Sequence, residues 1–232
     1  MQEFNYANLL NKVPIERGMT VDIASDLLNL VTISNAQGLL FDPNAFIDTV
    51  CDTVGEEGTV LIRTFSWDFC HGKGFDINRT RSRVGALGNI ALKRQDFQRT
   101  KHPIYSWMVW GKNRDVFCGL GNIESFGMDS IFAWQSEDDN SIQINLGNPD
   151  TIGLTILHFV EYKVGVTYRY VKNFTDTYVD KDGVSTKKTY SMYVRDLDHD
   201  TTIHVERYFS ELESQRAKLK EEYMGVPIEF FR

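Results

Sequence analysis

The segment Asp42-Pro-Asn-Ala-Phe-Ile-Asp-Thr-Val-Cys-Asp-Thr-Val-Gly-Glu-Glu-Gly-Thr-Val-Leu-Ile-Arg-Thr-Phe65 decides the fold, because it contains a helix followed directly by a strand. Asp42 and Pro43 are N-cap and N1 signals, and Gly55 ends the helix. The apolar residues of the helix recur every four positions, at Phe46, Val50 and Val54. The run from Gly58 onward is apolar and rich in β-branched residues, which predicts a strand.

Residues 19–24 predict an earlier strand, so the order strand, helix, strand favours two parallel strands in an α/β fold. We expect a layered mixed sheet flanked by helices. Further strands are expected at 106–111 and 141–146, and further helices at 6–12 and 84–93. A turn at 147–150 leads into a helix that contains His158.

The chain changes character after Val166. Two β-rich runs on either side of Asp180-Lys-Asp-Gly183 predict a hairpin within residues 166–200. Residues 203–223 predict a charged amphipathic helix. Because no internal repeat or firm boundary is visible, we expect a single domain spanning residues 1–232.

Composition narrows the class of protein. The chain has 232 residues, 42% of them hydrophobic, and a formal net charge of −7, which argues against a general nucleic-acid binder and mildly favours a cationic substrate. The three cysteines form neither a disulfide framework nor a CxxC metal site. No signal peptide and no apolar stretch of about 18 residues is visible, so we expect a cytoplasmic protein without a membrane span.

The pair His158 and Glu161 is the strongest candidate for chemistry. On a helix, residues three apart are neighbours, so the carboxylate can hold the imidazole, and an imidazole near a cleft can accept a proton at neutral pH. Local sequence leaves open whether this pair is catalytic or only structural. His102, before Pro103, is equally open between an ordinary loop residue and a site residue.

Other charged groups are less specific. Four arginines form either a solvated face or an anion site, since guanidinium groups match phosphate geometry: Arg79, Arg81, Arg83 and Arg99. Residues 196–200 contain three aspartates and a histidine, which we interpret as a charged surface turn and not as a metal site. The signatures GxGxxG, GxxxxGK[ST], GxSxG and HExxH are absent, which leaves a histidine-based transferase as the main enzymatic option.

Five motifs in order resemble those of the aminoglycoside 3-N-acetyltransferase family, which transfers acetyl from acetyl-CoA to amino groups. They are Gly55-Glu-Glu-Gly-Thr-Val-Leu61, Phe75-Asp-Ile-Asn-Arg-Thr-Arg-Ser-Arg-Val-Gly85, Arg99-Thr-Lys-His-Pro-Ile-Tyr-Ser106, Ser125-Phe-Gly-Met-Asp-Ser130 and Thr155-Ile-Leu-His-Phe-Val-Glu161. The resemblance covers about residues 9–174, and it implies that family's fold.

The resemblance also implies roles for individual residues. His158 would be the general base, assisted by Glu161, with acetyl-CoA as co-substrate and no metal. The thioester oxygen needs a donor, for which Ser25, a backbone amide after the first strand, and Ser106 stay open. The CoA-binding candidates are Ser25, Arg79, Arg81, Ser82, Arg99, His102 and Ser106. The candidates for contact with the acceptor are Phe65, Asp76 and Asp150.

Departures from the family bear on the substrate. The family's V-H-S-S-L is replaced at residues 22–27, where only the second serine is kept, and the aspartate expected six residues before the catalytic histidine is Ile152. Asp150 is displaced by two positions, and residues 165–174 look more like relatives in cell-surface polysaccharide biosynthesis.

We therefore expect an acyl-CoA-dependent N-acyltransferase acting on an amino sugar. The alternatives are an aminoglycoside 3-N-acetyltransferase that confers resistance and a non-catalytic binding protein on the same fold. The partner would be a small molecule, not a nucleic acid, and the oligomeric state stays open, a homodimer being one option.

Overall fold

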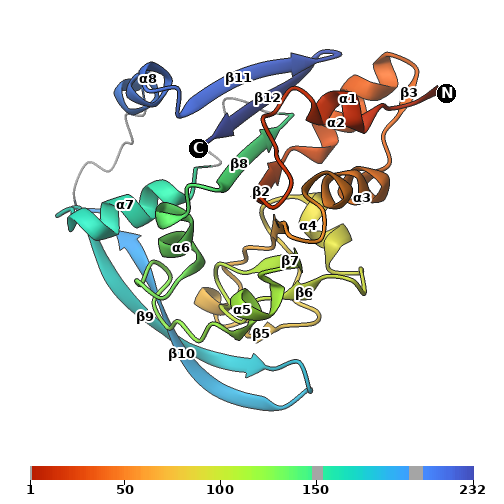
Figure 1. The fold of residues 1–232 in the computed structure, drawn as a ribbon. Helices are drawn as coiled ribbons and strands as arrows, with labels where there is room; N and C mark the ends of the chain where they lie inside the picture. Colours follow the sequence, from red (N-terminus) through yellow and green to blue (C-terminus); the bar gives the residue numbers. More distant parts are fainter. Residues whose placement is uncertain (1, 148–153, 199–205) are drawn as a thin grey trace.

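The computed structural model describes residues 2–147, 154–198 and 206–232. Its centre is a seven-stranded sheet with the order β11-β12-β8-β2-β4-β7-β6 (Figure 1). The three middle strands are β8 (Ser141–Leu146), β2 (Thr20–Ser25) and β4 (Thr59–Arg63), and β2 runs parallel to both of its neighbours. The outer strands β7 (Trp107–Gly111), β6 (Gln98–Arg99), β12 (Val226–Phe231) and β11 (Lys218–Tyr223) pair antiparallel. The predicted mixed α/β sheet and its first parallel pair are confirmed.

Helices cover both faces of this sheet. One face carries α1 (Tyr6–Leu10), α2 (Leu27–Ala36), α3 (Pro43–Val54) and α4 (Ala86–Ala91), and the other carries α5 (Arg114–Gly119), α6 (Ile131–Glu137) and α7 (Ile156–Val164). Alternation along β4 explains the two cores. Val60 and Ile62 pack into the first core, whereas Leu61 packs into the second, so the strand is apolar on both sides.

The helix predicted from Asp42 to Gly55 is α3. Asp42 Oδ1 accepts the backbone N–H of Asn44 at 2.8 Å, and Pro43 is the first helical residue. Gly55 ends the helix with φ of 68°, a conformation that favours glycine. The chain then turns directly into β4, as the sequence predicts.

A long hairpin forms a second sheet. It consists of β9 (Arg169–Val179) and β10 (Ser185–Arg195), paired antiparallel, with β5 (Phe75–Asp76) added parallel to β9. The predicted turn lies between these strands. The hairpin curves along one side of the molecule, away from β11 and β12 (Figure 1). The remaining short elements are β1 (Gln2–Glu3), β3 (Leu39–Leu40) and the 3₁₀ turn η1 (Phe69–His71).

The expectation of one helix over 203–223 is wrong beyond Ser214. Helix α8 spans Glu206–Ser214, and β11 and β12 follow as a hairpin. Both turn residues, Met224 and Gly225, have positive φ, which is the geometry of a type I′ turn. Because methionine occupies the first turn position, the sequence lacks the Asn-Gly or Asp-Gly pair that usually predicts such a turn. In the described residues, no helix is long and apolar enough to cross a membrane.

Candidate active site

Two cavities meet at His158. The first, which we call the sheet-edge cavity, has a volume of about 560 Å³ and lies beyond the carboxyl ends of β2, β4 and β8, with Ser25, Phe65 and Leu146 in its wall. The carboxyl edge of parallel strands is where α/β folds bind ligands. The second, the hairpin cavity, has a volume of about 690 Å³ and is lined mainly by the start of β9 and the end of β10.

Three side chains line both cavities: Trp67, Tyr105 and His158. A group bound in one cavity can therefore contact a group bound in the other at this junction. Such an arrangement suits a reaction between two substrates that enter from different sides.

Helix α7 positions the imidazole of His158. Its side chain is 24% exposed, and its Nδ1 lies 2.7 Å from Oε2 of Glu161, one turn further along the helix. The sequence-predicted pair therefore forms, and the imidazole reaches both cavities. The structure brings Ser25 and Phe65 into the sheet-edge cavity as well.

Sequence reasoning missed the partners of Glu161. Arg169 Nε lies 2.8 Å from Oε2 of Glu161, and the Tyr168 hydroxyl donates to Oε1 at 2.9 Å. Burial would raise the pKa of Glu161, but the hydrogen bonds from His158 and Tyr168 and the charge of Arg169 hold it below its ordinary value. The sequence signal for these partners was the adjacent pair Tyr168 and Arg169, to which no role had been given. The pair lies just beyond Gly165, where α7 ends.

These contacts determine the tautomer of His158. An ionised carboxylate only accepts hydrogen bonds, so Nδ1 of His158 must carry the proton that it shares with Glu161. Arg169 Nη2 lies 3.2 Å from the same Nδ1, and the shorter contact, to Glu161, assigns the proton of Nδ1 to the hydrogen bond with the carboxylate. The lone pair of the imidazole is therefore on Nε2, which leaves Nε2 able to accept a proton.

A buried ion pair lies beneath the sheet-edge cavity. Arg63 contacts the carboxylate of Asp22 through two nitrogens, with Nη2 2.7 Å from Oδ2. Asp22 also accepts from Trp107 Nε1 at 3.3 Å and from Gln135 Nε2 at 3.2 Å. This network fixes the ends of β2 and β4, which carry Ser25 and Phe65. It was not expected from the sequence, because its members are far apart along the chain.

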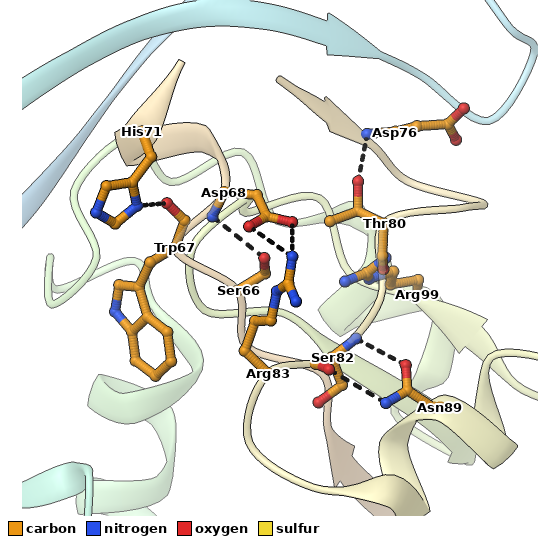
Figure 2. A network of polar contacts seen from close by, with 10 residues as sticks. All are labelled: Ser66, Trp67, Asp68, His71, Asp76, Thr80, Ser82, Arg83, Asn89 and Arg99. Atoms are coloured by element: carbon orange, nitrogen blue, oxygen red, sulfur yellow. Dashed lines mark hydrogen bonds and ion pairs between the residues drawn. The ribbon is translucent and has the colours of Figure 1, made fainter. Parts of the chain in front are cut away.

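The loop at 66–85 carries Trp67 to the junction, and its own polar contacts hold it (Figure 2). Arg83 Nη2 donates to both carboxylate oxygens of Asp68 at 3.0 Å. His71 Nδ1 lies 2.7 Å from the carbonyl oxygen of Trp67. Asp76 accepts the N–H groups of Asn78 and Arg79, so it shapes a turn of the loop and lies outside both cavities.

Three predicted CoA-binding residues are buried away from the two cavities. Arg99 is 5% exposed and donates to Ser106 Oγ and to the carbonyls of Thr64 and Thr80. Ser106 Oγ in turn donates to Thr64. His102 is buried, which lowers its pKa to about 3, and its Nδ1 accepts two backbone N–H groups. None of these three residues lines either cavity, and the hydrogen bonds of Arg99 and Ser106 go to protein groups.

The other predicted residues are separate from the junction. Ser82 is buried, and its backbone pairs with Asn89 (Figure 2). Arg79 and Arg81 are exposed on the loop that ends at the sheet-edge cavity. Asp150 lies outside the described residues. Within the described parts of the chain, no three His, Cys, Asp or Glu side chains converge as a metal site would require.

Comparisons with known proteins identify the family of this chain. A family model described as aminoglycoside 3-N-acetyltransferase matches residues 31–226, most of the chain. The fold and the match place the chain among N-acetyltransferases. In particular, it belongs to the aminoglycoside 3-N-acetyltransferase family. A search of curated proteins finds no match.

Several solved structures share the fold. The YokD protein from Bacillus subtilis is 19% identical with a TM-score of 0.72, and the match covers 96% of this chain and 90% of that one. AAC-IIIb, solved as a binary complex with CoASH, is 20% identical with a TM-score of 0.75, covering 99% and 92%. The aminoglycoside acetyltransferase AAC(3)-IIb is 15% identical with a TM-score of 0.78, covering 100% and 92%. At these identities the likeness shows the fold.

Proposed function

We propose that this protein transfers an acyl group, normally acetyl, from CoA to the amino group of an amino sugar, with His158 as the general base. The observation that carries the proposal is the position of His158. Its Nδ1 is held by Glu161, and its ring lies at the junction of two separate cavities.

The chemistry follows from that position. Nε2 of His158 removes a proton from the acceptor amine as the nitrogen forms a bond to the thioester carbonyl carbon. The electron pair of the carbonyl moves onto its oxygen, and when the pair returns, the carbon–sulfur bond breaks. The CoA thiolate then takes the proton from His158, so the amide and the free thiol leave with the protein unchanged. Glu161 stabilises the imidazolium formed in between.

We assign CoA to the sheet-edge cavity. Its wall is largely apolar, with Leu27, Leu28, Phe65 and Val84, which suits a pantetheine arm. Ser25 lies in this cavity and remains a proposed contact of the thioester end. Arg79 and Arg81, exposed on the neighbouring loop, remain the proposed contacts of the CoA phosphates. The CoASH complex of AAC-IIIb, which has the same fold, supports the choice of co-substrate.

We assign the acceptor to the hairpin cavity. Tyr170, Phe174 and Tyr193 offer aromatic faces on which a sugar ring can stack. The lining includes both signs of charge, with the cations Lys172 and Arg195 and the carboxylates Asp196 and Asp198. A polycation would need an excess of carboxylates, whereas an amino sugar with an anionic group, such as a nucleotide-linked sugar, fits both signs. We propose that this activity serves polysaccharide biosynthesis in the cytoplasm, because residues 165–174 look like those of relatives with that role.

Aminoglycoside 3-N-acetylation is the second candidate. The family description and the structure of AAC-VIa bound to sisomicin favour it. The mixed charge of the hairpin cavity opposes it.

Thiol release from acetyl-CoA tests the proposal. We expect release with nucleotide-linked amino sugars and little with 2-deoxystreptamine drugs. His158→Ala should lower kcat by about 10²–10⁴-fold, the usual contribution of a general base, while calorimetry still shows CoA binding. A protein that binds no acyl-CoA would refute the transferase proposal. Turnover on the drugs alone would favour the second candidate.

A further inference from the structure

The proposed acyl transfer needs a hydrogen-bond donor for the thioester oxygen, which becomes an oxyanion when the amine adds. The sequence left Ser25, a backbone amide and Ser106 as candidates. Ser106 is now excluded, because it is fully buried and its hydroxyl is bonded to Thr64 and Arg99. Ser25 lines the sheet-edge cavity but not the hairpin cavity.

The reacting carbonyl must lie where both cavities meet, because the thioester comes from one and the amine from the other. Three side chains line that junction, and each has one polar function. His158 accepts the proton of the amine. Trp67, through its indole N–H, and Tyr105, through its hydroxyl, are the two hydrogen-bond donors among these side chains. Of these two, the phenol O–H is the more acidic group and therefore the stronger donor to a developing oxyanion.

The ring of Tyr105 is held rigidly. It is 4% exposed and packs edge-on against Phe65, with the ring centres 5.0 Å apart. On another side it packs against the tilted ring of Phe126, at 5.1 Å between ring centres. Its backbone N–H donates to His102 Nδ1 at 3.2 Å, which ties the tyrosine to the buried histidine. A donor fixed in this way needs little reorganisation as charge develops.

The electrostatic surroundings favour the protonated phenol. Burial raises the pKa of Tyr105 more than the charge of Arg169 and the hydrogen bond from Trp67 lower it. In the described parts of the chain, no hydrogen bond from the Tyr105 hydroxyl to a protein acceptor is present. The O–H group is therefore a donor at neutral pH, with its proton free for a ligand.

We infer that Tyr105 is a catalytic residue whose hydroxyl donates a hydrogen bond to the thioester carbonyl oxygen. The inference rests on the proposed acyl transfer. The tyrosine stabilises the oxyanion while the carbon–nitrogen bond forms, and it keeps its own proton throughout. When the carbon–sulfur bond breaks, the oxygen becomes the amide carbonyl, and the thiolate is protonated by His158.

Infrared spectroscopy of bound acetyl-CoA, labelled with ¹³C at the carbonyl, tests the inference without an acceptor. In the wild-type protein the carbonyl band should move to lower wavenumber than in solution. Tyr105→Phe keeps the packed ring and removes the hydroxyl, so the band should return toward its solution position while acetyl-CoA still binds. Tyr190→Phe, a buried tyrosine outside both cavities, is the matched control and should leave the band unchanged.

Kinetics give an independent measure. Loss of one oxyanion donor typically lowers kcat by about 10²–10³-fold, and we expect Tyr105→Phe to do so with little change in KM for acetyl-CoA. Identical carbonyl bands in the wild type and Tyr105→Phe, with acetyl-CoA bound to both, would overturn the role of Tyr105 and leave the transferase proposal intact. Absence of acetyl-CoA binding to the wild type would overturn both.

Discussion

Arg169 Nε lies 2.8 Å from Oε2 of Glu161, and both side chains are less than 10% exposed. The same carboxylate oxygen holds Nδ1 of His158 at 2.7 Å. The arginine comes from the first residue of β9, so the hairpin contributes directly to the orientation of the imidazole on α7. The base, its carboxylate and the wall of the hairpin cavity therefore form one connected unit.

Replacement of Arg169 should lower the stability of the protein. Arg169→Met leaves the Glu161 carboxylate buried without its cation, and removal of one partner of a buried pair costs about 3–5 kcal/mol. Urea unfolding should show this loss. Arg114→Met, at an exposed pair with Asp115, is the control and should change the free energy of unfolding by less than about 1 kcal/mol. Equal effects of the two substitutions would contradict the buried role of Arg169.

The stability contributed by Glu161 should depend on pH in a defined direction. Because its folded pKa lies below the ordinary value of 4.5, its contribution is complete above that pH. It is lost as the pH falls through the lowered folded pKa. Urea unfolding should therefore give the wild type a higher free energy of unfolding than Glu161→Gln, with the largest difference at neutral pH. The difference should shrink in acid. A difference that grows on acidification would mean that the pKa is raised.

Charge reversal at Lys172 tests the acceptor assignment. Lys172 lines the hairpin cavity, so Lys172→Glu should raise KM for a nucleotide-linked amino sugar by about tenfold, the effect of about 1.4 kcal/mol. It should also improve turnover of cationic drugs. Lys187→Glu, in the part of β10 that does not line the cavity, makes the same change in net charge and should have little effect. Equal KM values for the two variants would place the acceptor elsewhere.

Local sequence signals predicted the first helices and strands of the central α/β layers well. The caps of α3 and the apolar run of β4 depend on residues close together in the chain, so they could be recognised directly. The C-terminal hairpin could not, because Lys218–Tyr223 alternates charges like an exposed helix, and its turn lacks the usual Asn-Gly or Asp-Gly pair. Its pairing with the sheet is a tertiary effect.

In the site too, contacts between residues close in the chain were predictable, and contacts between distant residues were not. His158 and Glu161 lie within one helical turn, so their contact was predictable, whereas Arg169 joins them only after the chain reverses at Gly165. Arginine residues gave no local sign of burial. Arg99 looked like a phosphate contact in the sequence, yet its hydrogen bonds all go to protein oxygens from distant segments.

The ion pair between Asp22 and Arg63 gives a final test of how the sheet supports the site. Asp22 is 1% exposed and Arg63 is 6% exposed, so Asp22→Leu alone should lower the free energy of unfolding by about 3–5 kcal/mol, because it leaves a buried cation. Arg63→Met alone should have a similar cost.

The double variant Asp22→Leu with Arg63→Met should lose much less than the sum of the two, since an apolar pair of similar volume removes both desolvation costs. Urea unfolding of the four proteins measures the coupling. The kcat of the double variant should still fall, because the ends of β2 and β4 carry Ser25 and Phe65 into the sheet-edge cavity. Additive losses of stability would show that the two side chains act separately.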